Sequence, residues 1–155
     1  MRNKVEDILD NGECWCIDFF PKKIENINEI ERIEDFMLIK RNKKRYAEKI
    51  INILLKIIPY YEVEFFIPET NIPCLKKYSD TRISTNIKLT KLEYIIRKII
   101  VNDGTFNVNV MSQNMVIQLQ LFNSGVYFLD DIDKKLLCKI IESEGLFFWK
   151  VVDDE

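Results

Sequence analysis

Histidine is missing from this 155-residue sequence, and its absence excludes several kinds of catalytic site. Without an imidazole there is no Ser-His-Asp or Cys-His pair, and no histidine ligand for zinc or iron. A general base that works near neutral pH would have to be a Glu, Asp, Lys or Cys whose pKa is strongly shifted by its surroundings. We therefore expect a protein that is not an enzyme and that carries no cofactor.

Long apolar runs and a strong net charge are also missing. The richest apolar segment is interrupted by Lys56 and Pro59, well short of the roughly 18 residues that span a membrane. The first residues mix charged and apolar side chains, which is not typical of a signal peptide. The net charge of -2 gives no general attraction to nucleic acid or to an anionic membrane. These features predict a cytoplasmic protein that does not bind membranes, and they disfavour nucleic acid as a partner.

The residues that are present describe one globular domain over positions 1–155. Hydrophobic residues make up 47% of the chain and charged residues 31%, and no linker or repeat divides it. The predicted helices cover residues 3–10, 29–38, 43–58 and a segment around 92–100, with a last one starting at Asp130. The predicted strands cover residues 14–20, 60–67, 105–111, 115–122 and 146–152. This order predicts an α+β fold with a mixed, mostly antiparallel sheet of about five strands and helices packed on it. Its second half fits a ferredoxin-like or related sandwich.

Three local signals place the ends of these elements. Asn3 is predicted to cap the first helix, and Thr90 and Glu93 match a capping box for the fourth. Gly145 suits the position that follows the last helix. The segment 146–152 is apolar on both faces, which predicts an interior strand.

The stretch ECWCIDFF, residues 13–20, is the one place where cysteines gather. Read as a strand, it directs Trp15 and Ile17 towards the core and Cys14 and Cys16 the other way. A closed zinc site needs four good ligands, and only two isolated cysteines remain elsewhere. The two-residue gap of thioredoxin-like motifs is missing too. We therefore interpret all four thiols as reduced and structural, with no bound metal.

Two groups of polar residues are candidates for binding a protein partner. Carboxylates late in the chain would form an acidic surface suited to a basic partner, although those before the last helix also suit its positive end: Asp130, Asp131, Asp133, Asp153 and Asp154. Amide side chains on one side of the predicted hairpin would form a second surface, because Asn is unfavourable in strands and so indicates a solvent-exposed or partner-covered face: Asn107, Asn109, Gln118 and Gln120.

Two other functions remain open at this point. The basic run at residues 40–45 would let the protein act as a nucleic-acid-associated regulator. Alternatively, a carboxylate or thiol centre would make it an enzyme. A deep pocket that gathers Asp18, Cys14 and Cys16, with a raised carboxylate pKa, would favour the enzyme.

Three stretches carry a resemblance that covers most of the chain: WCIDFFPKKI, RIEDFMLIKRNKKRYAEKIINILLKIIPYYEVEF and IIESEGLFFWKV. They resemble a group of small bacterial single-domain proteins that begin with a Trp-x-Ile-Asp-x-x-Pro strand and end with a Glu-Gly-Leu-Phe-x-Trp strand. In size and character the chain is also similar to the immunity proteins that neutralise bacterial toxins. This analogy implies a non-catalytic cytoplasmic protein that binds a toxin domain directly.

Overall fold

A computed structural model describes residues 2–68, 70–79, 82–83, 87–121 and 124–152. These residues form an α+β fold around one sheet with the strand order β3-β2-β4-β5-β6-β1-β7. Every neighbouring pair of these strands is antiparallel. The strands are β1 (Glu13–Asp18), β2 (Val63–Phe66), β3 (Arg82–Ile83), β4 (Phe106–Val110), β5 (Met115–Leu119), β6 (Gly125–Phe128) and β7 (Phe147–Lys150). The α-helices are α1 (Arg2–Asn11), α2 (Ile27–Leu38), α3 (Lys40–Ile57), α4 (Leu89–Val101) and α5 (Lys135–Ser143), and short 3-10 helices cover Pro73–Tyr78 and Met111–Gln113.

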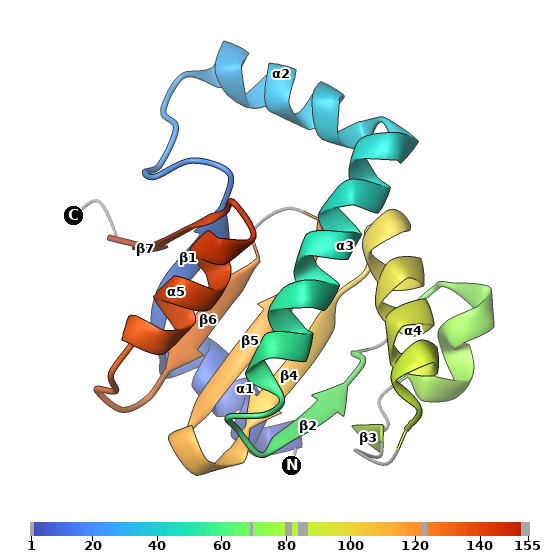
Figure 1. The fold of residues 1–155 in the computed structure, drawn as a ribbon, viewed down its shortest axis with the longest axis vertical. Coiled ribbons are helices and arrows are strands. Elements are labelled where there is room, and N and C mark those ends of the chain that lie inside the picture. Colours follow the sequence, from blue (N-terminus) through green and yellow to red (C-terminus); the bar gives the residue numbers. More distant parts are fainter. Residues whose placement is uncertain (1, 69, 80–81, 84–86, 122–123, 153–155) are drawn as a thin grey trace.

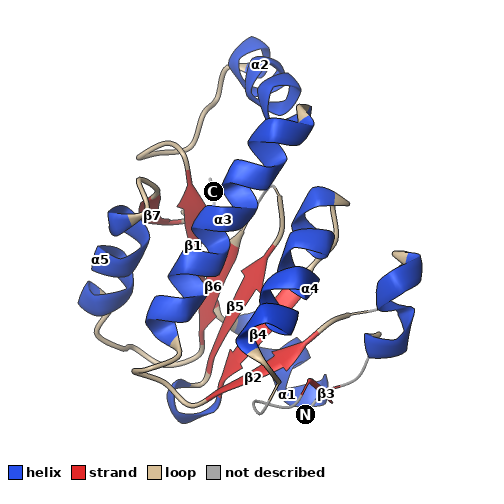
Figure 2. Ribbon diagram, turned by 45° about the vertical axis from the view of Figure 1, so that its right-hand side comes forward, coloured by secondary structure: helices blue, strands red, loops and turns tan. Residues whose placement is uncertain are grey.

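The helices lie in two layers, one on each face of the sheet. Figures 1 and 2 show α3, α4 and α5 across one face and α1 behind the other. On the side of α1, Val5 and Ile8 pack on Val116 of β5. The remaining α-helix, α2, lies beyond the end of the sheet and contacts the rest of the protein mainly where it meets α3 (Figure 1).

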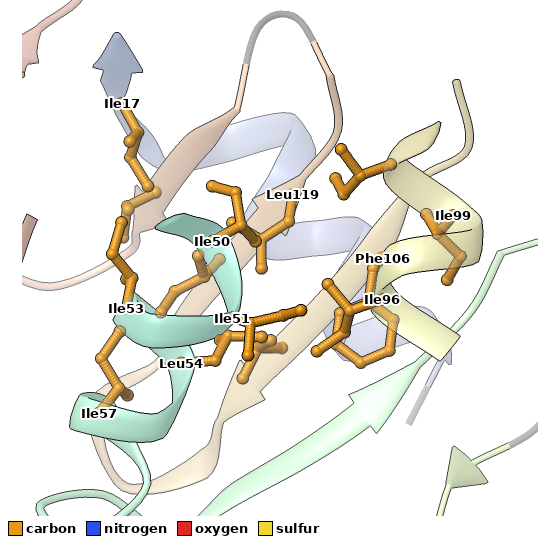
Figure 3. Close-up of a cluster of buried hydrophobic side chains, with 14 of the residues drawn as sticks. Ile17, Ile50, Ile51, Ile53, Leu54, Ile57, Ile96, Ile99, Phe106 and Leu119 are labelled. Atoms are coloured by element: carbon orange, nitrogen blue, oxygen red, sulfur yellow. The ribbon is translucent and has the colours of Figure 1, made fainter. Parts of the chain in front are cut away.

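The main core is made by apolar stripes that the sequence shows clearly. Ile50, Ile53 and Leu54 of α3 share one core cluster with Ile96 of α4 and Phe106 of β4, and all five are nearly inaccessible to solvent (Figure 3). A spacing of three or four residues puts the helical members on one side of each helix. The predicted apolar stripe of the third helix is thereby confirmed.

Two of the predicted helix caps are wrong. Asn3 and Thr90 lie inside helices, since α1 begins at Arg2 and α4 begins at Leu89 with Lys88 at its N-cap. In each case the regular helix starts one residue earlier, so neither residue occupies the N-cap position. At the other end, Gly145 follows α5 as predicted, with a φ of 71° that favours glycine.

The sheet departs from the prediction at its strands near the end of the chain. The sequence pattern predicts no strand at residues 125–128, yet β6 is an interior strand between β5 and β1. The predicted interior strand at 146–152 is wrong, because β7 lies at the edge and Phe147 is exposed. Since β1 pairs between β6 and β7, the second half of the chain does not form a separate ferredoxin-like sandwich.

Candidate partner-binding site

The predicted amide surface is not on the outside of the molecule. Asn107 and Asn109 are each only 2% exposed, so the prediction of a solvent-exposed face is wrong for both. Their side chains lie on the face of the sheet where α1 packs, and neither amide oxygen has a hydrogen-bond partner among the described residues. Gln118 and Gln120 are half-buried, and Gln120 accepts a hydrogen bond from the Thr105 hydroxyl at 3.3 Å.

The predicted acidic surface is partly present. Asp130, Asp131 and Asp133 share the exposed loop before α5. Asp133 accepts a hydrogen bond at 2.9 Å from the backbone N–H of Lys135, where α5 begins, so it helps to cap that helix. Asp130 and Asp131 also have local partners, in Asn114 and Lys134. The other two aspartates of the group, at positions 153 and 154, lie outside the described residues.

Among the described residues, exposed large apolar side chains are most concentrated on α2 and the residue that follows it. We call residues 27–39, which are α2 and the residue that joins it to α3, the arm. Four of its large apolar side chains are more than half exposed: Ile27 (71%), Phe36 (57%), Leu38 (53%) and Ile39 (55%). Only Met37 of α2 is fully buried. Four exposed apolar side chains on one short segment exceed what scattered surface residues explain, so the arm is a candidate interface.

The arm is also charged and held in place. Its acidic side chains are Glu29, Glu31, Glu34 and Asp35, against the single basic Arg32. The Asn26 side chain caps α2 by accepting from the backbone N–H of Asn28 at 3.0 Å. At the other end the Asn42 side chain donates to the Phe36 carbonyl at 2.7 Å, which fixes the junction of α2 with α3. The arm therefore presents apolar and acidic groups together from a defined position.

The basic run lies directly after the arm. Residues 40–45 form the first turns of α3, not a loop followed by a later helix. Lys40, Arg41, Lys44 and Arg45 line a shallow hollow together with Glu48. Lys43 turns away from it and pairs with Asp103 at 3.0 Å.

A cavity of about 390 Å³ lies between the arm and the C-terminal end of β1. We call it the arm pocket. The arm contributes Ile30, Ile33, Glu34 and Met37 to its lining, and β1 with the following loop contributes Cys14, Cys16, Ile17, Asp18, Phe19, Phe20, Lys23 and Ile24. The remaining walls come from α3, β6, β7 and nearby loops: Tyr46, Leu121, Ser124, Gly125, Tyr127, Trp149 and Val151. Cys14, Cys16 and Asp18 of ECWCIDFF thus line one pocket.

Asp18 is the charged group at the end of β1 inside this pocket. Its Oδ1 accepts hydrogen bonds from the backbone N–H groups of Phe19 (2.6 Å) and Phe20 (3.3 Å). Burial raises the pKa of Asp18 above its usual value, although these two hydrogen bonds oppose the shift. Its Oδ2 lies 4.0 Å from the Cys16 sulfur, and no Lys or Arg of the described residues forms an ion pair with Asp18.

The Cys16 thiol of the pocket is not activated. Burial raises the pKa of Cys16 to about 12, with smaller contributions from nearby Asp18 and Cys14. The Cys16 side chain is therefore a thiol at neutral pH and a poor nucleophile. Cys14 is half-buried as well, whereas Cys74 is exposed and does not fit the interpretation of a buried structural side chain.

Hydrogen bonds between distant segments hold the pocket walls. The Trp149 indole N–H donates to the Phe20 carbonyl at 2.9 Å, which ties β7 to the loop after β1. The Tyr46 hydroxyl of α3 donates to the Ser124 hydroxyl at 3.0 Å, and the backbone N–H of Ile17 donates to the Ser124 carbonyl at 2.8 Å. The sequence placed Asp18 opposite the core face but gave no signal that Trp149 or Tyr46 would face it.

Three further findings bear on the site. Within the ranges that the structure describes, no three His, Cys, Asp or Glu side chains are grouped so as to hold a metal ion. No helix in those ranges has the length and apolar character to cross a membrane. Comparison of the chain with models of known families, with curated proteins and with solved structures finds no match.

Proposed function

We propose that this chain is a non-catalytic binding protein that captures a protein partner on the arm. The observation that carries the proposal is the exposed apolar surface of Ile27, Phe36, Leu38 and Ile39. Burying such side chains against a partner is favourable by about 25 cal/mol per Å² of apolar area removed from water. Interfaces also concentrate their binding energy in a few large side chains such as Phe36.

The acidic residues of the arm indicate the character of the partner. Glu29, Glu31 and Asp35 are exposed on the same helix as the apolar residues, so a basic surface would be attracted and a second acidic surface repelled. We propose a partner whose contact surface is basic at its rim and apolar at its centre. By the resemblance to immunity proteins, that partner is a bacterial toxin domain and the encounter takes place in the cytoplasm.

The test is affinity capture from the source cells with two matched double variants. Ile27→Asp/Phe36→Asp places two charges on the arm, and Leu89→Asp/Tyr60→Asp places the same charges on exposed apolar residues away from it. Ile27 and Leu89 are both the first residue of a helix, where an added carboxylate is tolerated. Exposed substitutions of this kind change stability by only about 0.5 kcal/mol, so both variants should stay folded.

A partner that binds wild type and the Leu89/Tyr60 variant, but not the arm variant, would support the proposal. Its identity decides the finer part, because a toxin domain should arrest growth when expressed alone and should be tolerated when this chain is expressed with it. Equal recovery of every partner by the arm variant and by wild type would contradict the arm as the binding surface.

The arm pocket favours a second candidate function, an enzyme in which Asp18 serves as general acid or base. The pocket gathers Asp18 with Cys14 and Cys16, and burial raises the carboxylate pKa, which is the pattern of many acid-base sites. Because Cys16 stays protonated, this candidate rests on the carboxylate and not on a thiol nucleophile. Hydrolysis of ester, amide, glycoside or phosphate ester substrates by wild type, lost in Asp18→Asn, would favour the enzyme.

A further inference from the structure

We propose that the arm pocket binds an organic cation, an ammonium or guanidinium group on an aliphatic chain. In the proposed function this group is a Lys or Arg side chain of the partner, so that part of the inference rests on the proposed function. The cation-binding chemistry itself rests on the pocket alone.

The first observation is a carboxylate without a cation. Asp18 is half-buried at the pocket wall, and within the described ranges no basic side chain pairs with it. Its Oδ1 is occupied by two backbone N–H groups, while the neighbour of its Oδ2 is the Cys16 thiol at 4.0 Å. A buried carboxylate of this kind gains most from a donor that brings a positive charge.

The second observation is the wall around that carboxylate. Aromatic rings of Phe19, Phe20, Tyr127 and Trp149 line the same cavity, and Ile30 closes it from the arm. Aromatic faces attract cations, and aliphatic stems pack well on apolar walls. A ligand with an apolar stem and a cationic end matches both parts of the lining.

The other polar groups of the pocket do not reverse its preference for a positively charged ligand. Glu34 adds a second carboxylate from the arm, and the Cys16 thiol is protonated at neutral pH. The Tyr46 hydroxyl is already used as a donor to Ser124. Lys23 is the one basic residue in the lining, and its side chain is exposed. An anion would therefore meet two carboxylates, whereas a cation meets complementary charge.

The experiment compares two small probes of equal length, hexylammonium and 1-hexanol, with the purified full chain at pH 7. The readout is the indole N–H signal of Trp149 in two-dimensional NMR spectra. The indole of Trp15 is the internal control, because Trp15 lies on the opposite side of β1 from Cys14, Cys16 and Asp18. Asp18→Asn removes the charge, and Asp10→Asn removes a carboxylate from the exposed end of α1 as the matched control.

We expect hexylammonium to shift Trp149 with an affinity about tenfold higher than that of hexanol, as one charge-assisted hydrogen bond would give. Asp18→Asn should abolish this preference and keep the weak shift by hexanol, while Asp10→Asn should behave as wild type. Equal affinities for the two probes in wild type, a preference that survives Asp18→Asn, or no shift of Trp149 by either probe would overturn the inference.

The same variant distinguishes the source of the cation. If Asp18→Asn also lowers the affinity of the captured partner about tenfold, the cation is a side chain of that partner. If partner binding is unchanged while hexylammonium binding is lost, the pocket serves a free amine. Since the probes need no partner, failure of the arm variants in the capture experiment leaves this result intact.

Discussion

Ser124 is the acceptor on which the buried hydroxyl of Tyr46 depends, and its replacement tests how the pocket wall is held. The Ser124 Oγ accepts from the Tyr46 O–H (3.0 Å) and from the Gln120 backbone N–H (3.0 Å), and donates to the Gln120 carbonyl (2.6 Å). A serine hydroxyl has one donor and two acceptor positions, so all three are used. Burial also raises the pKa of Tyr46, so its phenol is protonated and must donate.

The two single substitutions should differ in cost because of this arrangement. Ser124→Ala leaves the Tyr46 hydroxyl buried without a partner, which costs about 2–3 kcal/mol of the free energy of unfolding. Tyr46→Phe removes the hydroxyl itself and leaves Ser124 bonded to Gln120, so it costs only about 1 kcal/mol. In the double variant the orphaned hydroxyl is gone, and its cost should fall short of the sum by about 1–2 kcal/mol.

Urea unfolding followed by circular dichroism measures these differences. With a slope near 2 kcal/mol per molar urea, Ser124→Ala should lower the midpoint by about 1 M. Strictly additive costs, or a Tyr46→Phe variant at least as unstable as Ser124→Ala, would refute the reasoning that Ser124 is the essential partner of Tyr46.

Glu13 and Gly145 allow two tests of the fold that need no partner. Hydrogen bonds from Lys150 and Trp15 lower the pKa of Glu13 from 4.5 to about 2, so its stabilising contribution is complete above pH 4.5 and is lost as the pH falls towards 2. Glu13→Gln should therefore flatten the decline of the urea midpoint between pH 5 and pH 2, as measured at about five pH values, and an unchanged slope would contradict this. Gly145→Ala should lower the free energy of unfolding by about 1–2 kcal/mol, because the φ of 71° is unfavourable for alanine. The added Cβ would meet only the Lys49 ammonium, at 3.4 Å, so a steric clash does not contribute. An unchanged melting temperature would contradict this reasoning about the backbone.

The elements predicted well from sequence are those that bury apolar side chains on one side only, at the regular spacing of a helix or a strand. The stripe that includes Ile50, Ile53 and Ile57 has the helical period and packs as the period requires. Trp15 and Ile17 alternate with the cysteines and lie on the predicted side of β1, with the Trp15 ring 5.0 Å from that of Phe148. In these cases local pattern and tertiary packing agree.

The errors arise where neighbours distant in sequence decide the environment. Asn109 looks like an exposed residue because amides are unfavourable in strands, yet Glu64 and Val116 pair beside it in the sheet and the whole row is buried. Residues 125–128 form only four positions of strand, too short for alternation to be distinguished from a loop.

The arm and its pocket show the same limit. The apolar residues between 24 and 39 recur every third position, which fits a helix only approximately. Most of them are not buried by the rest of the protein, so packing against the core does not impose the helical period on this segment. The pocket joins Phe20 to Trp149 across 129 positions of sequence. No local period indicates that contact, so the residue types of ECWCIDFF are visible in the sequence while the side chains that surround them are not.

Two features that cost the isolated chain stability lie next to each other in this structure. Ile27 and Phe36 keep apolar surface in water, and Asp18 keeps a half-buried carboxylate without a cation in the described part of the chain. The same chain buries its α3 and α4 stripes almost completely, so its core does not lack apolar packing elsewhere. Departures from local consistency tend to occur where a protein acts. A partner with an apolar centre and a basic group would relieve both costs at once, and on this ground we propose that the arm and the pocket act as one site.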